Sequence, residues 1–256
     1  MLSFFILAFA IGWIPWVVRI YNPGFQFQVF VFAPLAAALV VSAAIGIKEL
    51  KQWLLRIIHW RVRWWWYAIA LILPIFIKEM ASTINLMIGA TAMHGNDYIW
   101  KSFLENFRPA FLLPLVWILC EESGWRGFAT PRLLERYPVL VTGLLMGLIW
   151  SIWNLPLILT GEITIMELVK GIAHAIILTA IIQATKGSVV ICILLLASNN
   201  IIARIYFGLF EGENAARLDI ILVILWWGIA LMMALITNWQ GKKISTDIVN
   251  RKAVIQ

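Results

Sequence analysis

The segment from Cys120 to Arg126 gathers three ionisable side chains within an otherwise apolar stretch. Glu121 and Glu122 are adjacent, so a helix points their carboxyl groups about 100° apart. Glu122 and Arg126 are four residues apart, which places a carboxylate and a guanidinium on the same helical face. We therefore predict that Arg126 keeps Glu122 ionised, while Glu121 is free to meet a water molecule or a substrate.

Glu121 is the candidate general base of this cluster. A carboxylate in a poorly solvated pocket is a better proton acceptor near neutral pH than a carboxylate in water. A charge at the centre of a bilayer costs about 2.5–3.5 kcal/mol on an insertion scale, so an embedded carboxylate needs a partner or a function. The alternative is a purely structural ion network of Glu121, Glu122 and Arg126, because such networks also perturb ionisation.

The composition predicts that a membrane bundle positions these residues. Of the 256 residues, 62% are apolar and only 13% are charged, which leaves too little polar surface to face water. Apolar stretches of about 18 or more residues, each able to cross roughly 30 Å of hydrocarbon, recur along the chain. We predict an all-α, polytopic membrane helix bundle with about eight transmembrane helices. The expected spans are about 2–18, 28–46, 64–84, 109–128, 139–160, 165–183, 188–207 and 218–238.

The distribution of basic residues predicts the orientation of the bundle and its partners. With eight spans, most lysines and arginines outside the spans fall on the side that holds both termini, which we therefore expect to be cytoplasmic. On the other side lie Arg19, Lys101, Arg108, Lys170 and Arg217. The net charge of +7 is spread over short loops, so it favours the lipid bilayer and not nucleic acid as a partner. We interpret the first apolar stretch as a retained helix.

An interfacial amphipathic helix is expected between the second and third spans. Leu50, Trp53 and Ile57 recur at helical spacing, while Lys48 and Lys51 occupy the other face. Residues 1–240 are predicted to form a single integral membrane domain, and residues 241–256 a short basic cytoplasmic tail.

Three motifs resemble the signatures of the CAAX protease and bacteriocin-processing (CPBP) family of intramembrane endopeptidases. Glu-Glu-Ser-Gly-Trp-Arg, beginning at Glu121, is similar to the family pattern E-E-x-x-x-R. Gly-Leu-Ile-Trp-Ser-Ile-Trp-Asn-Leu-Pro (147–156) and Ala-Ser-Asn-Asn (197–200) fall where the second and third signatures belong. The resemblance covers about residues 30–205. It implies that the chain lies in a bacterial or archaeal plasma membrane. It also implies that the substrate is a CAAX-type or leader peptide, or a lipidated protein that carries one, and that cleavage occurs near the carboxyl end of the substrate.

The resemblance also implies a set of catalytic positions, of which two are altered. The positions in this chain are Glu121, Glu122, Arg126, Asn154, Leu196 and Asn200. The family has histidines, and in one interpretation a zinc ion, where Asn154 and Leu196 stand. An amide is a poor zinc ligand and leucine is none. We therefore expect no resident metal, and a metal-free route in which Glu121 is the base and the amides of Asn154 and Asn200 are oxyanion donors.

Two other functions compete with hydrolysis. Loss of both histidines favours a non-catalytic pseudoprotease, for example a membrane binding or bacteriocin self-immunity protein. A transporter would also use embedded charges, but the two halves of the chain show no repeat.

Three other embedded ionisable residues are given structural interpretations. His174 lies within the sixth span, and we interpret it as a core histidine that could join the site only if its helix faces Glu121. Lys78 and Glu79 lie near the end of the third span, where pairing with each other or snorkelling would account for both. Close helix approach beside the cavity, which we expect to open toward the cytoplasm, is expected at Gly143 and Gly147.

Overall fold

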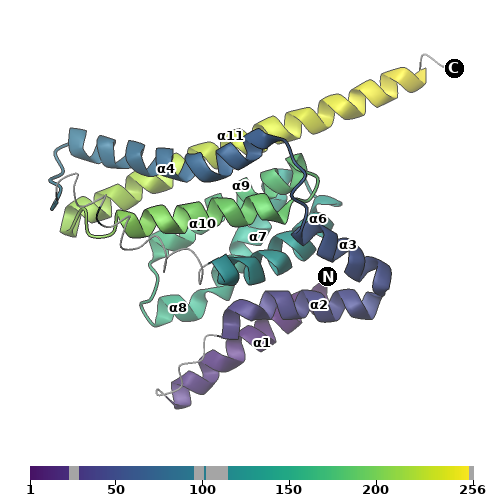
Figure 1. The fold of residues 1–256 in the computed structure, drawn as a ribbon, viewed down its shortest axis with the longest axis horizontal. Coiled ribbons are helices and arrows are strands. Elements are labelled where there is room, and N and C mark those ends of the chain that lie inside the picture. The colour runs from purple at the N-terminus through teal and green to yellow at the C-terminus, as the bar shows by residue number, and fades with distance from the viewer. Residues whose placement is uncertain (23–28, 95–100, 102–114, 254–256) are drawn as a thin grey trace.

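The computed structural model describes residues 1–22, 29–94, 101 and 115–253, and this part of the chain contains helices and no strand (Figure 1). Residues 115–124 are helical and lead directly into a π-helical segment, η2. The elements are α1 (Leu2–Tyr21), η1 (Val29–Phe32), α2 (Ala33–Ile45), α3 (Ile47–Ile57), α4 (Trp64–Met87), η2 (Trp125–Ala129), α6 (Thr130–Leu134), α7 (Val139–Trp153), α8 (Leu155–Leu159), α9 (Ile165–Ala184), α10 (Val189–Ile205) and α11 (Gly212–Ala253).

The helices confirm the predicted all-α membrane bundle. By length and composition, α1, α4, α9 and residues Gly212–Thr237 of α11 can each cross a bilayer. The shorter apolar helices α2, α7 and α10 fall on three further predicted spans. The fourth predicted span, 109–128, lies partly outside the described residues, and its described part is helical. The chain is an integral membrane protein.

Helix α9 is the central element of the bundle. In its apolar window 61% of the residues are buried, compared with 17–28% in the other three long helices. The close approach of α7 to α9 depends on two glycines, as the sequence predicted. A Cβ added at Gly143 would lie 2.6 Å from Ile176 Cα, and one at Gly147 would lie 2.9 Å from Ile172 Cα.

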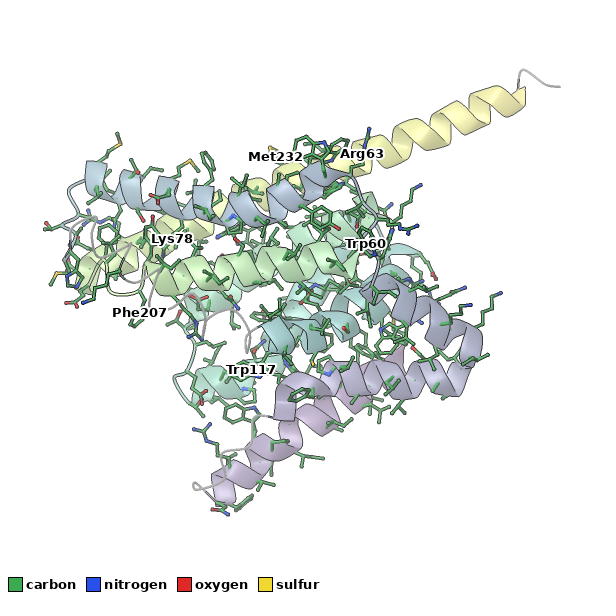
Figure 2. All side chains as sticks on the ribbon, viewed as in Figure 1. Trp60, Arg63, Lys78, Trp117, Phe207 and Met232 are labelled. Atoms are coloured by element: carbon green, nitrogen blue, oxygen red, sulfur yellow. The ribbon has the colours of Figure 1, made fainter. Side chains whose placement is uncertain are left out.

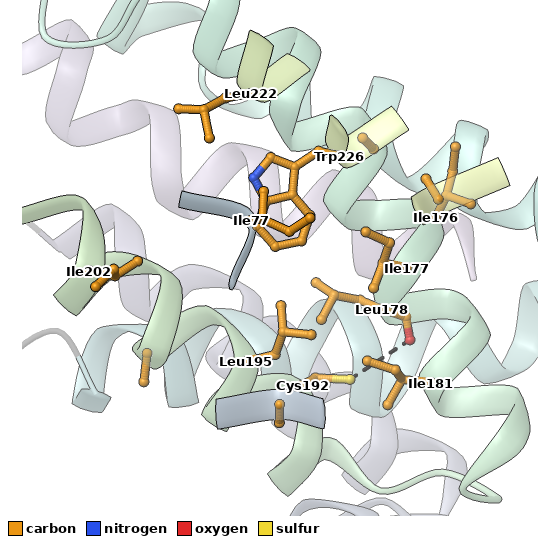
Figure 3. Close-up of a cluster of buried hydrophobic side chains, with 14 of the residues drawn as sticks. Ile77, Ile176, Ile177, Leu178, Ile181, Cys192, Leu195, Ile202, Leu222 and Trp226 are labelled. Atoms are coloured by element: carbon orange, nitrogen blue, oxygen red, sulfur yellow. Dashed lines mark hydrogen bonds between the residues drawn. The ribbon is translucent and has the colours of Figure 1, made fainter. Parts of the chain in front are cut away.

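One apolar core joins α9 to α4, α10 and α11. Figure 3 shows Ile177 and Leu178 of α9 facing Leu195 of α10 and Trp226 of α11. The Cys192 thiol donates a hydrogen bond to Leu178 O at 3.8 Å. Burial of these side chains fixes the rotation of α9 and α10, and so decides which of their residues face the site.

A second core, rich in aromatic side chains, joins α1, α2 and α3 to the segment that carries the acidic pair. The rings of Trp125 and Trp153 meet edge to face at 5.6 Å, and those of Phe4 and Phe128 stack at 4.9 Å. Gly124 lies against the backbone of α2, because an added Cβ would come within 2.4 Å of Pro34 O.

Helix α3 forms as predicted and docks on η2. Trp53 is 1% exposed and donates from Nε1 to Ser123 O at 2.8 Å, while Lys48 and Lys51 are exposed. Arg132 and Glu49 form an ion pair that links α6 to α3. At the other end of the chain, the backbone of the predicted tail continues helix α11 as far as Ala253 and projects beyond the bundle (Figure 1).

Candidate active site

Arg126, the predicted partner of Glu122, lies in the π-helical segment η2. The backbone N–H of Thr130 bonds to Trp125 O five residues earlier, and the Thr130 hydroxyl donates to the same oxygen at 2.9 Å. Pro131 has no N–H to offer the Gly127 carbonyl four residues before it, and the Arg56 guanidinium donates to that oxygen at 3.5 Å. Such π turns occur frequently at functional sites.

Glu122 and Arg126 form the ion pair that their spacing predicted. Arg126 Nη1 lies 3.1 Å from Glu122 Oε1, and the two side chains are 4% and 3% exposed. The pair is incomplete, because Glu122 Oε2 and Arg126 Nε are buried without a hydrogen-bond partner in the described structure. Buried polar atoms normally have partners, so these two atoms have the capacity to bond to water or a ligand.

A cavity of about 170 Å³ brings most of the predicted site residues together. Glu121, Glu122 and Arg126 line it from one side, and Leu196 and Asn200 line it from α10. Glu122 and Arg126 are almost fully buried, whereas Asn200 is exposed. The cavity therefore combines a sealed charged wall with a polar wall that water can reach.

Trp150 contacts Glu121 directly. Its indole N–H, the one donor of that side chain, hydrogen bonds to the Glu121 carboxylate. The ring lies over Gly171 of α9, where an added Cβ would come within 2.3 Å of it. The absent side chain at Gly171 thus lets Trp150 reach the cavity and orient the carboxylate.

Asn154 is the one predicted site residue that does not line this cavity. It ends α7, is 5% exposed, and donates from Nδ2 to Trp150 O at 2.8 Å. Its amide thus folds back on its own helix, four residues upstream, and supports Trp150. The two asparagines in the cavity wall are Asn199 and Asn200.

His174 lies in the wall of the same cavity. Its ring meets Trp226 edge to face at 4.4 Å, and its Nε2 is buried without a hydrogen-bond partner in the described structure. His174 thus meets the condition that the sequence analysis set for joining the site, because its helix faces the cavity that holds Glu121. The sequence could not predict that His174 faces this cavity, because the packing of α9 against α7, and not a local sequence signal, sets the direction of its side chain.

A second cavity of about 340 Å³, here called the outer chamber, adjoins the first. The two share Glu167, His174 and Asn199 as lining residues. The outer chamber lies between α4, the start of α9, the end of α10 and the start of α11. Figure 2 shows Lys78 and Phe207, which line it, on the half of the bundle away from Trp60 and Arg63.

The opening of the cavity toward the cytoplasm stays a prediction, and the described residues differ between the two ends of the bundle. Phe207, in the wall of the outer chamber, is 80% exposed at the end opposite the basic loops. At the basic end, α3 covers the acidic pair's helix, and Trp53, Trp125 and Phe128 are buried there. Aromatic side chains are thus packed at the basic end, and the outer chamber lies toward the other end among the described residues.

Lys78 and Glu79 do not pair with each other, contrary to one expectation. The Tyr206 hydroxyl donates a hydrogen bond to Glu79 Oε1. Adjacent residues of a helix point in different directions, and only Lys78 lines the outer chamber.

Comparisons with known proteins identify the relationship. A sequence model of the Type II CAAX prenyl endopeptidase Rce1-like family matches residues 103–202. The CAAX prenyl protease 2 of Methanococcus maripaludis is 42% identical over 61 residues, which are 24% of this chain and 22% of that protein. Both comparisons support the resemblance of this chain to the CPBP family. The matched stretch thus spans about a fifth of the length of this curated relative.

The donor set of this cavity does not fit a zinc ion. Leu196 presents only carbon to the cavity, and Asn154 uses its amide nitrogen on Trp150 O. Among the described residues, no group of three His, Cys, Asp or Glu side chains is placed to hold a metal. Zinc is ordinarily held by three or four nitrogen, sulfur or carboxylate ligands. The described residues of this site therefore do not form the ligand set that a zinc ion needs.

Sequence reasoning missed Trp150, His174 and Asn199 as neighbours of Glu121. Trp150 and Asn199 lie inside the second and third CPBP signatures, at positions to which we gave no role. One signal could have found Trp150, because a large donor side chain one helical turn before Asn154 faces the same way as the predicted site position. His174 carried only the general signal of an ionisable residue in a span.

Proposed function

We propose that this chain is a metal-free intramembrane endopeptidase in which Glu121 activates water. One observation carries the proposal. Glu121, Glu122, Arg126 and Asn200 line a single cavity. Three buried polar atoms of residues in its wall have no partner among the described residues: Glu122 Oε2, Arg126 Nε and His174 Nε2. A cavity with unsatisfied polar groups beside a buried carboxylate is suited to binding water and a peptide.

The reaction begins with a water molecule between Glu121 and the scissile carbonyl. Glu121 takes a proton from the water as its oxygen forms a bond to the carbonyl carbon, and the carbonyl oxygen becomes an oxyanion. Collapse of this tetrahedral intermediate breaks the C–N bond. Glu121 returns the proton to the departing nitrogen, so the peptide and one water molecule give a carboxylic acid and an amine. The acid then transfers its proton to the amine, which leaves a carboxylate and an ammonium group.

The other cavity residues position these groups. The Trp150 indole orients Glu121 through its hydrogen bond, and the Glu122–Arg126 pair keeps a cation beside the reacting atoms. The Asn200 amide and the His174 imidazole supply N–H donors to the oxyanion. Removing one donor of this kind typically lowers the rate by about 10²–10³. Asn154 acts by supporting Trp150.

The substrate is a CAAX-type or leader peptide reached from the bilayer. The relative's name, CAAX prenyl protease 2, supports a peptide of this kind. An apolar bundle also gives a lipidated protein a path from the bilayer to the cavity. Both termini are cytoplasmic in this proposal, as the distribution of basic residues favours.

A cleavage assay in reconstituted liposomes tests the proposal. We compare the native chain with Glu121→Gln, and with Glu135→Gln as a control that neutralises an exposed carboxylate at the end of α6. Cleavage by the native chain and by Glu135→Gln, with loss in Glu121→Gln, supports Glu121 as the base. Equal cleavage by all three chains would remove Glu121 from the mechanism.

A non-catalytic peptide-binding role is the second candidate, because Leu196 offers no polar atom to the cavity. The double substitution Asn154→His plus Leu196→His separates the two functions. Cleavage only after this substitution would identify a pseudoprotease, for which bacteriocin self-immunity is the candidate role.

A further inference from the structure

The outer chamber contains a lysine, Lys78, that forms no direct ion pair with a described carboxylate. Lys170, in the same wall, lies 2.5 Å from Glu167 and 3.0 Å from Asp219. Lys78 has no hydrogen bond or ion pair within the part of the chain that the structure describes. Its Nζ instead lies 5.8 Å from the centroid of the Tyr206 ring.

An ammonium group inside a bundle is costly unless an anion accompanies it. Of the carboxylates nearest Lys78, Glu79 accepts from Tyr206, while Glu167 and Asp219 bind Lys170. Glu167 and Asp219 thus act on Lys78 through space, while their direct contacts are with Lys170. The free position beside Lys78 fits an anionic group that arrives with a ligand.

The walls of the chamber indicate what carries that anion. Around Lys78 the lining is largely apolar and aromatic, with Ile202, Phe210, Leu222 and Trp226 among its members. The volume of about 340 Å³ lies within the roughly 300–1,000 Å³ typical of small-ligand pockets. These properties fit a short apolar segment that ends in a single negative charge.

The chamber also leads to the catalytic cavity. Glu167, His174 and Asn199 line both hollows, so one extended ligand can occupy the two together. A peptide whose last residues fill the outer chamber therefore places an upstream peptide bond beside Glu121.

We propose that Lys78 binds the terminal carboxylate of the peptide substrate and so makes the outer chamber the site for the residues after the scissile bond. The proposal rests on the proposed function for the direction in which the peptide runs. Lys78 lies outside residues 103–202, the segment that matches the Rce1-like family. A phosphate from an anionic lipid is the rival occupant.

Equilibrium binding tests this assignment independently of cleavage. The Glu121→Gln variant is placed in lipid nanodiscs and serves as the parent protein. The probes are two fluorescein-labelled hexapeptides of alanine and leucine, one with a free terminal carboxylate and one with a terminal amide. We expect the free carboxylate to bind about tenfold or more tightly, since a charged hydrogen bond is worth about 1.5–3 kcal/mol. Lys78→Met should remove this preference, and Lys78→Arg should keep most of it.

Lys48→Met is the matched control, because it removes the same charge from the exposed face of α3. Its preference for the carboxylate should equal that of the parent. Equal binding of both peptides to the parent, or an undiminished preference in Lys78→Met, would overturn the assignment. Nanodiscs rich in phosphatidylglycerol add a third arm, and competition by that lipid with loss of the carboxylate preference would assign Lys78 to lipid phosphate.

Failure of this inference and failure of the proposed function give different results. If the chain does not cleave peptides but the carboxylate preference depends on Lys78, the chamber is a binding site for peptide ends. If the chain cleaves amidated and free peptides equally well, Glu121 remains the base and the role of Lys78 is wrong.

Discussion

The buried Glu122–Arg126 pair determines the electrostatics of the site. A contact of 3.1 Å joins the two groups, and each keeps one polar atom without a partner in the part of the chain that the structure describes. Removal of one partner from a buried pair leaves an uncompensated charge, which is more costly than the pair itself. The arrangement is thus both a structural support and a source of hydrogen bonds for a ligand.

Arg126→Met should destabilise the chain by about 3–5 kcal/mol, because the Glu122 carboxylate would stay buried without its cation. Reversible unfolding in mixed micelles, followed by circular dichroism, measures the change. Adding Glu122→Gln to Arg126→Met should recover part of the loss. A loss below about 1 kcal/mol in the single variant would show that the pair contributes little.

His174→Phe should reduce the rate of peptide cleavage at saturating substrate by about 10²–10³, since it removes an N–H donor from the cavity. His174→Asn should keep more activity, because an amide retains a donor. The same change at the basic end of the bundle, His59→Phe, is the control. If His174→Phe and His59→Phe cleave at the same rate, His174 has only a packing role.

At the scale of single residues, the sequence predicted an ion pair within one helix but not which side chains of different helices contact each other. The four-residue spacing of Glu122 and Arg126 predicted their ion pair because helical geometry fixes it. The direction of His174 could not be predicted, since it depends on how α9 packs. The amide of Asn154 returns to its own helix end, a local competition that the signature alone does not reveal.

Glycines set the spacing of the elements around the site. Gly143 and Gly147 bring α7 onto α9, and Gly171 of α9 accommodates the ring of Trp150. The last contact links helix packing to chemistry, because the same indole donates to Glu121.

Gly171→Ala should lower the cleavage rate more than it lowers stability, because the new methyl group would displace Trp150 from Glu121. Gly228→Ala on α11 is the matched control, since its added Cβ meets nothing within 4 Å. Alanine is favoured over glycine inside a helix by about 0.5–1 kcal/mol, so the control should be neutral or slightly stabilising. Steady-state kinetics and unfolding of both variants measure the two effects. Full activity in Gly171→Ala would mean that the position of Trp150 is unimportant.

Elements with strong periodicity were predictable, whereas irregular ones were not. The face that Trp53 buries followed from the spacing of apolar residues in α3. The π turn at Trp125–Ala129 carries no such pattern, and it depends on the Thr130 hydroxyl and on the carbonyl released by Pro131.

At the scale of the whole molecule, basic loops and the polar chamber lie at opposite ends of the bundle. Trp60 and Arg63 mark the basic end in Figure 2, and Phe207 marks the other. The distribution of basic residues predicts that the basic end is cytoplasmic, so the chamber faces the opposite side of the membrane.

Cysteine labelling in intact cells measures this orientation. Lys48→Cys and Phe207→Cys, both at exposed positions, are introduced separately after Cys120 and Cys192 are replaced by alanine. A membrane-impermeant maleimide added outside should label only Phe207→Cys. Labelling of only Lys48→Cys would reverse the orientation and place the chamber on the cytoplasmic side.

The most direct test of metal-free hydrolysis by Glu121 is the single-turnover cleavage rate of the reconstituted chain in metal-stripped buffer. We expect the native chain to cleave at an unchanged rate after chelation, and Glu121→Gln to be slower by about 10²–10⁴, as expected for loss of a general base. A native rate that falls on chelation and returns with added zinc, or an undiminished rate in Glu121→Gln, would contradict the mechanism.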